Sequence, residues 1–180
     1  MALDAEERPS QPITKFESML KTDDVYFFDA EDFEDIIHHY LNNGKIALAK
    51  KAIKIGLQQH TESIEIKLLQ IEVLVFENKL EDAEKMLDQL QLLELHNEEI
   101  YIQRANIFSK KDNHIAAINL LEKALEISDD AFDIYSLLGM EYLFMDDFEL
   151  AKKSFMKCVE FDDEDYSSLY NVIYCFEFLE

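Results

Sequence analysis

Residues 132–165 read FDIYSLLGMEYLFMDDFELAKKSFMKCVEFDDED and form one complete copy of a pattern that recurs along the chain. The alanine near the middle of this copy, Ala151, is preceded at intervals of 34 residues by Ala117, Ala83 and Ala49. A fixed period of this length is typical of proteins built from stacked units that cannot bury their apolar faces alone. The sequence therefore predicts four units of one repeated design.

Each unit keeps its residue types at fixed distances from the alanine. Large apolar residues stand nine positions before it and four positions after it: Tyr40, Leu74, Phe108, Tyr142, Ile53, Leu87, Leu121 and Phe155. Five positions before it are residue types that accept turns or left-handed backbone: Gly44, Asn78, Asp112 and Asp146. Each unit is therefore predicted to be a helix, a tight turn and a second helix.

The apolar residues within these segments recur at three- and four-residue steps, as one face of a helix requires. The predicted first helices are 30–42, 64–77, 98–110, 132–145 and 166–180, and the predicted second helices are 45–59, 79–92, 113–127 and 147–161. Asp29, Asp130 and Asp165 each precede a first helix. Their carboxylates can accept hydrogen bonds from the free amides of the first helical turn.

Composition agrees with a helical chain and limits its partners. Three Gly and two Pro are few breakers for 180 residues. The 17 Lys and Arg against 39 Asp and Glu give a formal net charge of −22. This sign opposes binding to nucleic acid or to an anionic membrane surface and favours a basic or neutral partner. The opening residues 1–12 contain no apolar run long enough for a signal peptide or a membrane span, so a cytoplasmic location is expected.

The phases of the pattern resemble the tetratricopeptide repeat, whose unit also has 34 residues. The fourth unit is most similar, with Tyr135, Leu138, Gly139, Tyr142, Ala151 and Phe155. The first two units are more degenerate, with Lys67 and Gln70 in place of an aromatic residue and a leucine in the second, and no unit has the closing proline of the family. The resemblance implies an all-α fold, a right-handed superhelical solenoid of antiparallel helix hairpins. The predicted organisation is an N-terminal segment 1–29 with a short capping helix, repeats 30–63, 64–97, 98–131 and 132–165, and a last helix 166–180.

The two ends of the repeat pattern carry further expectations. Ile13, Phe16, Met19 and Leu20 can line one side of a short helix that covers the first repeat. Residues 166–180 match the first helix of a fifth unit, and the sequence ends five residues before the position of the next alanine. We expect either a fragment of a longer array or a solo capping helix. The apolar residues that crowd this helix could also pair it with a second copy.

The resemblance implies that the first helices line a concave groove for a peptide or a protein surface. The residues at inward phases are Glu31, Glu34, Asp35, His38, Leu68, Leu69, Glu72, Phe76, Ile102, Gln103, Asn106, Lys110, Ser136, Leu137, Met140 and Phe144. This set is acidic at one margin and apolar toward the other, which suits a segment that carries Lys or Arg beside apolar anchors. The alternative interpretation is that the acidic residues only complement helix dipoles and keep the surface hydrated.

One subtype of the family grips the C-terminal carboxylate of chaperone tails with Lys, Asn and Arg at defined inward phases. Those phases here hold Glu34, His38, Leu69, Glu99 and Gln103. A carboxylate clamp is therefore not expected in these repeats.

Signals for chemistry are weak. Cys158 and Cys175 fall at apolar phases and are interpreted as packing residues rather than redox or metal groups. The adjacent His38 and His39 point about 100° apart on a helix, so a metal site is not expected there. The acidic run 162–165 lacks the alternating ligands and the glycine of a calcium loop and is interpreted as a turn. No phosphate loop, nucleophile elbow or Cys-x-x-Cys motif occurs.

These observations predict a scaffold without catalytic residues, cofactor or metal, which binds a protein or peptide partner. The alternative is a regulatory or docking module of a larger protein that carries an enzymatic or sensory domain elsewhere.

Overall fold

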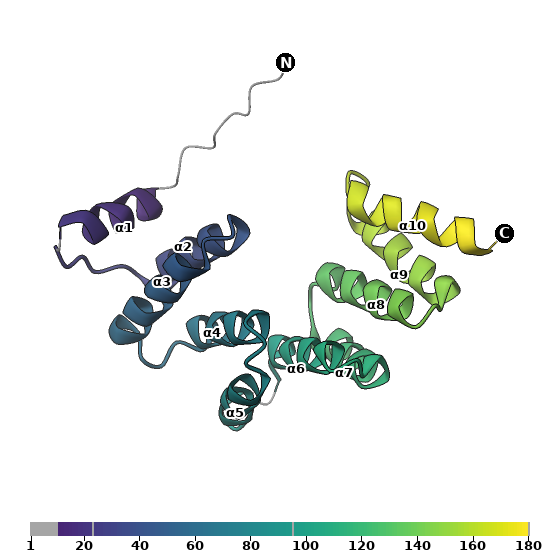
Figure 1. Cartoon of the computed structure of the whole chain (residues 1–180), viewed down its shortest axis with the longest axis horizontal. Coiled ribbons are helices and arrows are strands. Elements are labelled where there is room, and N and C mark those ends of the chain that lie inside the picture. The colour runs from purple at the N-terminus through teal and green to yellow at the C-terminus, as the bar shows by residue number, and fades with distance from the viewer. Residues whose placement is uncertain (1–10, 23, 95, 180) are drawn as a thin grey trace, which may run out of the picture. The chain divides into compact units, whose positions relative to one another are not determined.

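The computed structural model describes residues 11–22, 24–94 and 96–179, which form ten helices and no strand (Figure 1). The helices are α1 (Gln11–Thr22), α2 (Ala30–Asn42), α3 (Ile46–Gln59), α4 (Ile64–Phe76), α5 (Leu80–Gln91), α6 (Glu98–Lys110), α7 (His114–Ile127), α8 (Phe132–Phe144), α9 (Phe148–Phe161) and α10 (Tyr166–Leu179). The first ten residues of the predicted N-terminal segment lie outside the described range. The prediction of an all-α fold built from helix hairpins is confirmed. From α2 onward, each helix begins and ends within one residue of its predicted bounds.

None of the helices in the described residues has the length and apolar character that a membrane crossing requires.

One left-handed residue closes the turn inside each repeat, as the column of turn formers predicts. Gly44, Asn78, Asp112 and Asp146 have φ of 66°, 59°, 56° and 58°. The residue after each of them donates its N–H to a carbonyl oxygen five residues earlier, for example Lys45 to Tyr40 at 2.8 Å. This hydrogen bond belongs to a Schellman motif, which satisfies a carbonyl group that the end of the helix leaves free. The turn therefore has the same construction in all four repeats.

Aspartate side chains accept hydrogen bonds at the starts of first helices, as predicted. The Oδ1 atom of Asp165 accepts from the amides of Ser167 and Ser168 at 3.1 and 3.2 Å. Asp29 forms a capping box with Asp32. The Oδ1 atom of Asp130 accepts from Phe132 N at 3.1 Å, although the residue in the cap position is Ala131.

The described residues divide into two compact units, residues 1–73 and 74–180. In unit 1, α1 packs on α2 and α2 packs on α3. The fully buried ring of Phe16 on α1 lies 6.4 Å from the ring of Phe33 and 6.1 Å from the ring of Tyr40. The N-terminal helix α1 therefore packs on the first helix of the first repeat. This helix extends two residues beyond the predicted span 13–20 at each end.

Two side chains at the end of α3 hold the connector between α1 and α2. The Gln59 side chain accepts from Phe28 N at 3.0 Å and donates to Tyr26 O at 2.9 Å. His60 Nε2 lies 2.7 Å from Phe28 O. These hydrogen bonds satisfy extended backbone that no strand pairs with. They aim Phe28 into the core and leave Phe27 exposed.

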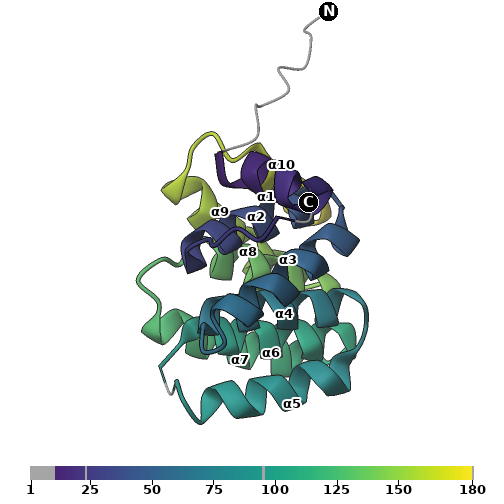
Figure 2. The same cartoon turned by 90° about the vertical axis from the view of Figure 1, so that its left-hand side faces the viewer.

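In unit 2, each helix from α5 to α9 packs on the helix that follows it. Figures 1 and 2 show the α6–α7 hairpin from two directions. The four alanines of the repeat are fully buried: Ala49 in unit 1, and Ala83, Ala117 and Ala151 in unit 2. In the fourth repeat α8 and α9 approach so closely that a Cβ atom added to Gly139 would lie 2.6 Å from the ring of Phe155. Glycine at this phase therefore permits the close helix contact.

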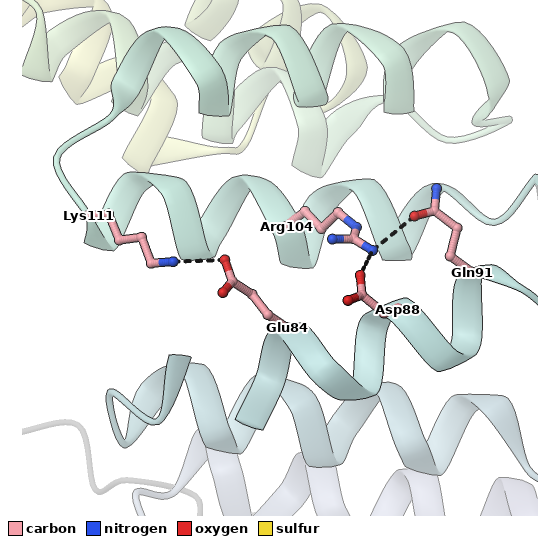
Figure 3. Close-up of polar contacts among 5 residues, drawn as sticks. All are labelled: Glu84, Asp88, Gln91, Arg104 and Lys111. Atoms are coloured by element: carbon pink, nitrogen blue, oxygen red, sulfur yellow. Dashed lines mark hydrogen bonds and ion pairs between the residues drawn. The ribbon is translucent and has the colours of Figure 1, made fainter. Parts of the chain in front are cut away.

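Charged side chains join the second repeat to the third across the α5–α6 contact (Figure 3). Arg104 Nη2 donates to Asp88 Oδ1 at 2.7 Å and to Gln91 Oε1 at 2.9 Å. Lys111 Nζ lies 2.8 Å from Glu84 Oε1. Ion pairs as exposed as these contribute about 0–1 kcal/mol each. They orient the contact more than they stabilise it.

Candidate protein-binding surface

The predicted groove residues fall in both units, and each unit is described by itself. In unit 1, Glu31, Asp35 and His38 of α2 are exposed, and Glu34 is half-buried. Burial, followed by the negative charge of Glu65 at the start of α4, raises the pKa of the Glu34 carboxyl. Glu31, Glu34, Asp35 and Glu65 therefore share one negative field, and we call them the acidic surface.

Other predicted groove residues in unit 1 are less accessible. Leu68 and Leu69 on α4 are buried, and Leu69 belongs to the core that also contains Phe33 and Ile53. Glu72 is half-buried. A partner on this face would reach carboxylates before it reached apolar side chains.

In unit 2, the predicted residues of α6 are mostly covered. Ile102 and Gln103 are buried, Asn106 is half-buried and Lys110 is exposed. Gln103 Nε2 donates to Glu99 Oε1 at 2.7 Å. The Oε1 atom of Gln103 is buried and has no hydrogen-bond partner within the described residues. This oxygen is an acceptor that a donor from outside the chain would satisfy.

The predicted residues of α8 offer the apolar contacts. Ser136 and Leu137 are half-buried, whereas the exposed fractions of Met140 and Phe144 are 38% and 58%. Phe76, at the end of α4, is also exposed. On α8, the exposed Met140 and Phe144 both lie in the C-terminal half of the helix.

A polar contact that the sequence analysis did not predict orients Phe144. His114 Nδ1 lies 2.8 Å from Oε2 of the buried Glu141, and the His114 ring stacks on the Phe144 ring with centroids 5.1 Å apart. One signal was available in the sequence. In α8, Glu141 stands alone between Met140 and Tyr142, and acidic residues are seldom fully buried unless they are paired.

The repeat phase extends the predicted set of residues onto α10. Tyr170, Tyr174 and Phe178 follow Ser136, Met140 and Phe144 by one period of 34 residues. The Phe178 ring stacks on Phe148 at 4.6 Å and lies 4.8 Å from the Tyr174 ring. We call Met140, Phe144, Tyr174 and Phe178 the apolar surface of unit 2.

The two cysteines lie on the last two helices, Cys158 on α9 and Cys175 on α10. Cys158 and Cys175 are buried, and burial raises the pKa of each thiol. Cys158 Sγ donates to Phe132 O at 3.5 Å. Within residues 11–22, 24–94 and 96–179, no group of three or more His, Cys, Asp or Glu side chains could hold a metal ion.

Comparison with known protein families identifies two of the helix hairpins. The model of the tetratricopeptide repeat family matches residues 98–130 and 132–165, which are the α6–α7 and α8–α9 hairpins. Comparison with curated protein sequences gives no significant match.

Solved structures have a similar fold over most of the chain. A thermophilic tetratricopeptide repeat protein of Thermus thermophilus is 18% identical, with a TM-score of 0.74 over 91% of this chain and 88% of its own. A tetratricopeptide repeat protein of Parabacteroides merdae is 14% identical, with a TM-score of 0.76 over 91% of this chain and 63% of its own. The structure of the APC/C hetero-tetramer Cut9–Hcn1 is 12% identical, with a TM-score of 0.73 over 93% of this chain and 32% of its own. Residues 98–130 and 132–165 therefore match the tetratricopeptide repeat family, and the chain has the fold of tetratricopeptide repeat proteins over most of its length.

Proposed function

We propose that the chain is a non-catalytic scaffold that binds a peptide or a protein surface through the first helices of its repeats. The tetratricopeptide repeat fold suggests a protein–protein interaction scaffold. One of the similar structures is itself a complex, the hetero-tetramer of Cut9 and Hcn1.

The apolar surface of unit 2 is the observation that carries the proposal. Large apolar side chains that gather on one exposed face mark interaction sites more often than isolated ones do. Phe144 is held in place by His114, and Tyr174 and Phe178 are held by Phe148. Rings that are already oriented lose little conformational freedom on binding.

Charge selects the partner. Residues 74–180 carry 25 Asp and Glu against 9 Lys and Arg, so the apolar surface lies in a unit with a formal net charge of 9 − 25 = −16. Unit 1 carries an acidic surface of its own, Glu31, Glu34, Asp35 and Glu65. A segment that alternates Lys or Arg with large apolar residues would be attracted by charge and held by apolar contact.

The proposal is tested with two labelled synthetic peptides that share the same apolar residues and differ in having Lys or Glu between them. Fluorescence anisotropy should show binding of the lysine peptide and much weaker binding of the glutamate peptide. Phe144→Asp should weaken binding of the lysine peptide by about tenfold or more, as hot-spot losses do. Met156→Asp is the matched control, because Met156 is an exposed apolar residue on the second helix α9. Equal weakening by both variants, or equal binding of both peptides, would refute the proposed surface.

A further inference from the structure

Helix α10 is apolar on two opposite sides. Its inner side places Val172 and Cys175 in a buried cluster with Ala151 and Phe155 of α9. Its outer side exposes Tyr166, Leu169, Tyr170 and Ile173, with exposed fractions of 75%, 40%, 69% and 51%. These four residues follow the i, i+3, i+4, i+7 spacing of a helix contact face, and we call them the outer stripe. A helix that is apolar on both sides is normally covered on both.

The outer stripe differs from the apolar surface of unit 2. By the repeat phase, Leu169 and Ile173 correspond to Tyr135 and Gly139 of α8, which lie against Phe161 and Phe155 of α9. Only Tyr170 shares a phase with a predicted groove residue, Ser136. An occupant of the outer stripe is therefore separate from the partner proposed above.

Charge points to the occupant. Two copies of a chain with a net charge of −22 repel each other over most of their surfaces. Within Tyr166–Leu179 only Glu177 carries a formal charge, so two copies can approach each other here at the least electrostatic cost. A basic segment would find almost no countercharge on this stripe. We propose that the outer stripe of α10 binds the outer stripe of a second copy of this chain.

The position of Glu177 selects the direction of the pairing. In an antiparallel two-fold pair centred between Tyr170 and Ile173, Tyr170 faces Ile173 of the other copy and Tyr166 faces Glu177 of the other copy. The tyrosine hydroxyl can then donate to the carboxylate. The two Glu177 carboxylates are about 16 Å apart along the helix axis, at 1.5 Å per residue, which is beyond the Debye length of about 8 Å at physiological salt. A parallel pair would place the two carboxylates opposite each other. The antiparallel pair is also the closed two-fold arrangement that most homodimers use.

The size of the face predicts a weak dimer. If each side chain offers about 200 Å² when fully exposed, the stripe together with the flanking Phe176 can bury about 550–600 Å² per copy. A standard interface buries about 800 Å² per partner. We therefore expect a reversible dimer with a dissociation constant on the order of 10 µM.

The test is sedimentation equilibrium of the 180-residue chain from about 1 µM to about 200 µM, a range that brackets such a constant. The wild type should pass from monomer to dimer. Ile173→Lys and Leu169→Lys should each weaken association by about tenfold or more, because two lysines would be brought into an apolar contact. Circular dichroism and thermal melting check that both variants remain folded. Phe144→Asp should leave the dimer unchanged, which separates this surface from the peptide-binding surface.

Tyr166→Lys tests the direction of pairing. In the antiparallel pair the new lysine faces Glu177 of the other copy, so the dimer should persist and become weaker as salt increases. The double variant with Tyr166→Lys and Glu177→Lys should dissociate.

A wild type that is monomeric at the highest concentration would overturn the proposal, as would a dimer insensitive to Ile173→Lys and Leu169→Lys. Loss of binding of the lysine peptide by a monomeric chain on Ile173→Lys would instead assign the stripe to another protein. Dissociation by Tyr166→Lys alone would overturn the antiparallel register.

Discussion

At the scale of single residues, the turn of each repeat depends on one residue in the left-handed region. Gly44 adopts φ of 66°, and a Cβ atom added there would meet nothing within 4 Å. Gly44→Ala therefore changes the backbone energy without a steric clash. It should lower the free energy of unfolding by about 1 kcal/mol, because alanine disfavours positive φ.

Urea denaturation followed by circular dichroism measures this change. Asp112→Gly is the matched control, since Asp112 has φ of 56° in the corresponding turn, and it should be neutral or slightly stabilising. Equal destabilisation by both substitutions would contradict the backbone explanation.

Gly139 tests a different property of glycine. Alanine has a better helix propensity by about 1 kcal/mol, so Gly139→Ala would be stabilising on an open helix surface. Here the added methyl group would lie 2.6 Å from the fully buried Phe155 ring. Overpacking costs about 1–3 kcal/mol, so it should outweigh the gain in helix propensity.

The melting temperature of Gly139→Ala should fall accordingly. Phe155→Leu creates space at the same contact, so the double variant should lose less stability than the sum of the two single variants. Additive losses would show that the two residues do not share one contact.

At the scale of elements, the connector between α1 and α2 depends on Gln59. Gln59→Leu removes an acceptor from the amide of the buried Phe28 and a donor to Tyr26 O. A buried amide left without a partner costs about 1–3 kcal/mol. Residues 24–29 should then be cleaved faster in limited proteolysis. The matched control is Gln58→Leu, because Gln58 is the exposed neighbour on the same helix, and it should not change the cleavage rate.

The start of α10 depends on Asp165. The Ser168 hydroxyl and the amides of Ser167 and Ser168 lower the pKa of the Asp165 carboxyl below its ordinary value of 3.8. Asp165→Ala removes the cap and should cost about 1 kcal/mol at neutral pH. Because the folded-state pKa is lowered, this stabilisation is present above the unfolded-state pKa and is lost as pH falls through the folded-state pKa.

The difference in stability between wild type and Asp165→Ala should therefore shrink below about pH 4. Asp165→Asn keeps an acceptor for the first-turn amides, so it should retain most of the cap without the pH dependence. Urea titrations of the three proteins at neutral and acidic pH measure both effects. A difference between wild type and Asp165→Ala that is independent of pH would contradict the role of the charged carboxylate.

From α2 onward, the helices were predictable to within one residue because local signals mark them. The period places each alanine, and the left-handed residues, such as Asp112 and Asp146, end the first helices. The Gln59 contact with the connector has no such signal, because it joins a side chain to backbone 31 and 33 residues away. The candidate surface was less predictable than the helices. The repeat phase predicts that Leu69 and Phe144 both lie on the groove face of a first helix. Leu69 is buried and Phe144 is exposed, because burial depends on the neighbouring helices.

At the scale of the whole molecule, the excess of negative charge either attracts a basic ligand or only keeps the surface hydrated. Glu34 separates the two interpretations. Its pKa is raised above the ordinary value of 4.5 by burial and by the neighbouring acidic residues Glu65, Glu31 and Asp35. The folded state therefore holds this proton more tightly than the unfolded state, so its contribution to stability decreases as pH rises from about 4.5 through the folded-state pKa.

Glu34→Gln should consequently stabilise the chain at neutral pH and have little effect near pH 4. If the acidic surface binds basic side chains, the same substitution should weaken binding of the lysine peptide, and it should do so more at about 0.05 M than at about 0.5 M salt. Glu126→Gln removes the same charge from the exposed surface of α7 and is the matched control for net charge. Thermal melts and fluorescence anisotropy on the three proteins measure both properties. If Glu34→Gln stabilises the chain and leaves the peptide affinity unchanged, these carboxylates only keep the surface hydrated. A binding role requires that Glu34, which destabilises the free chain, also stabilises the complex.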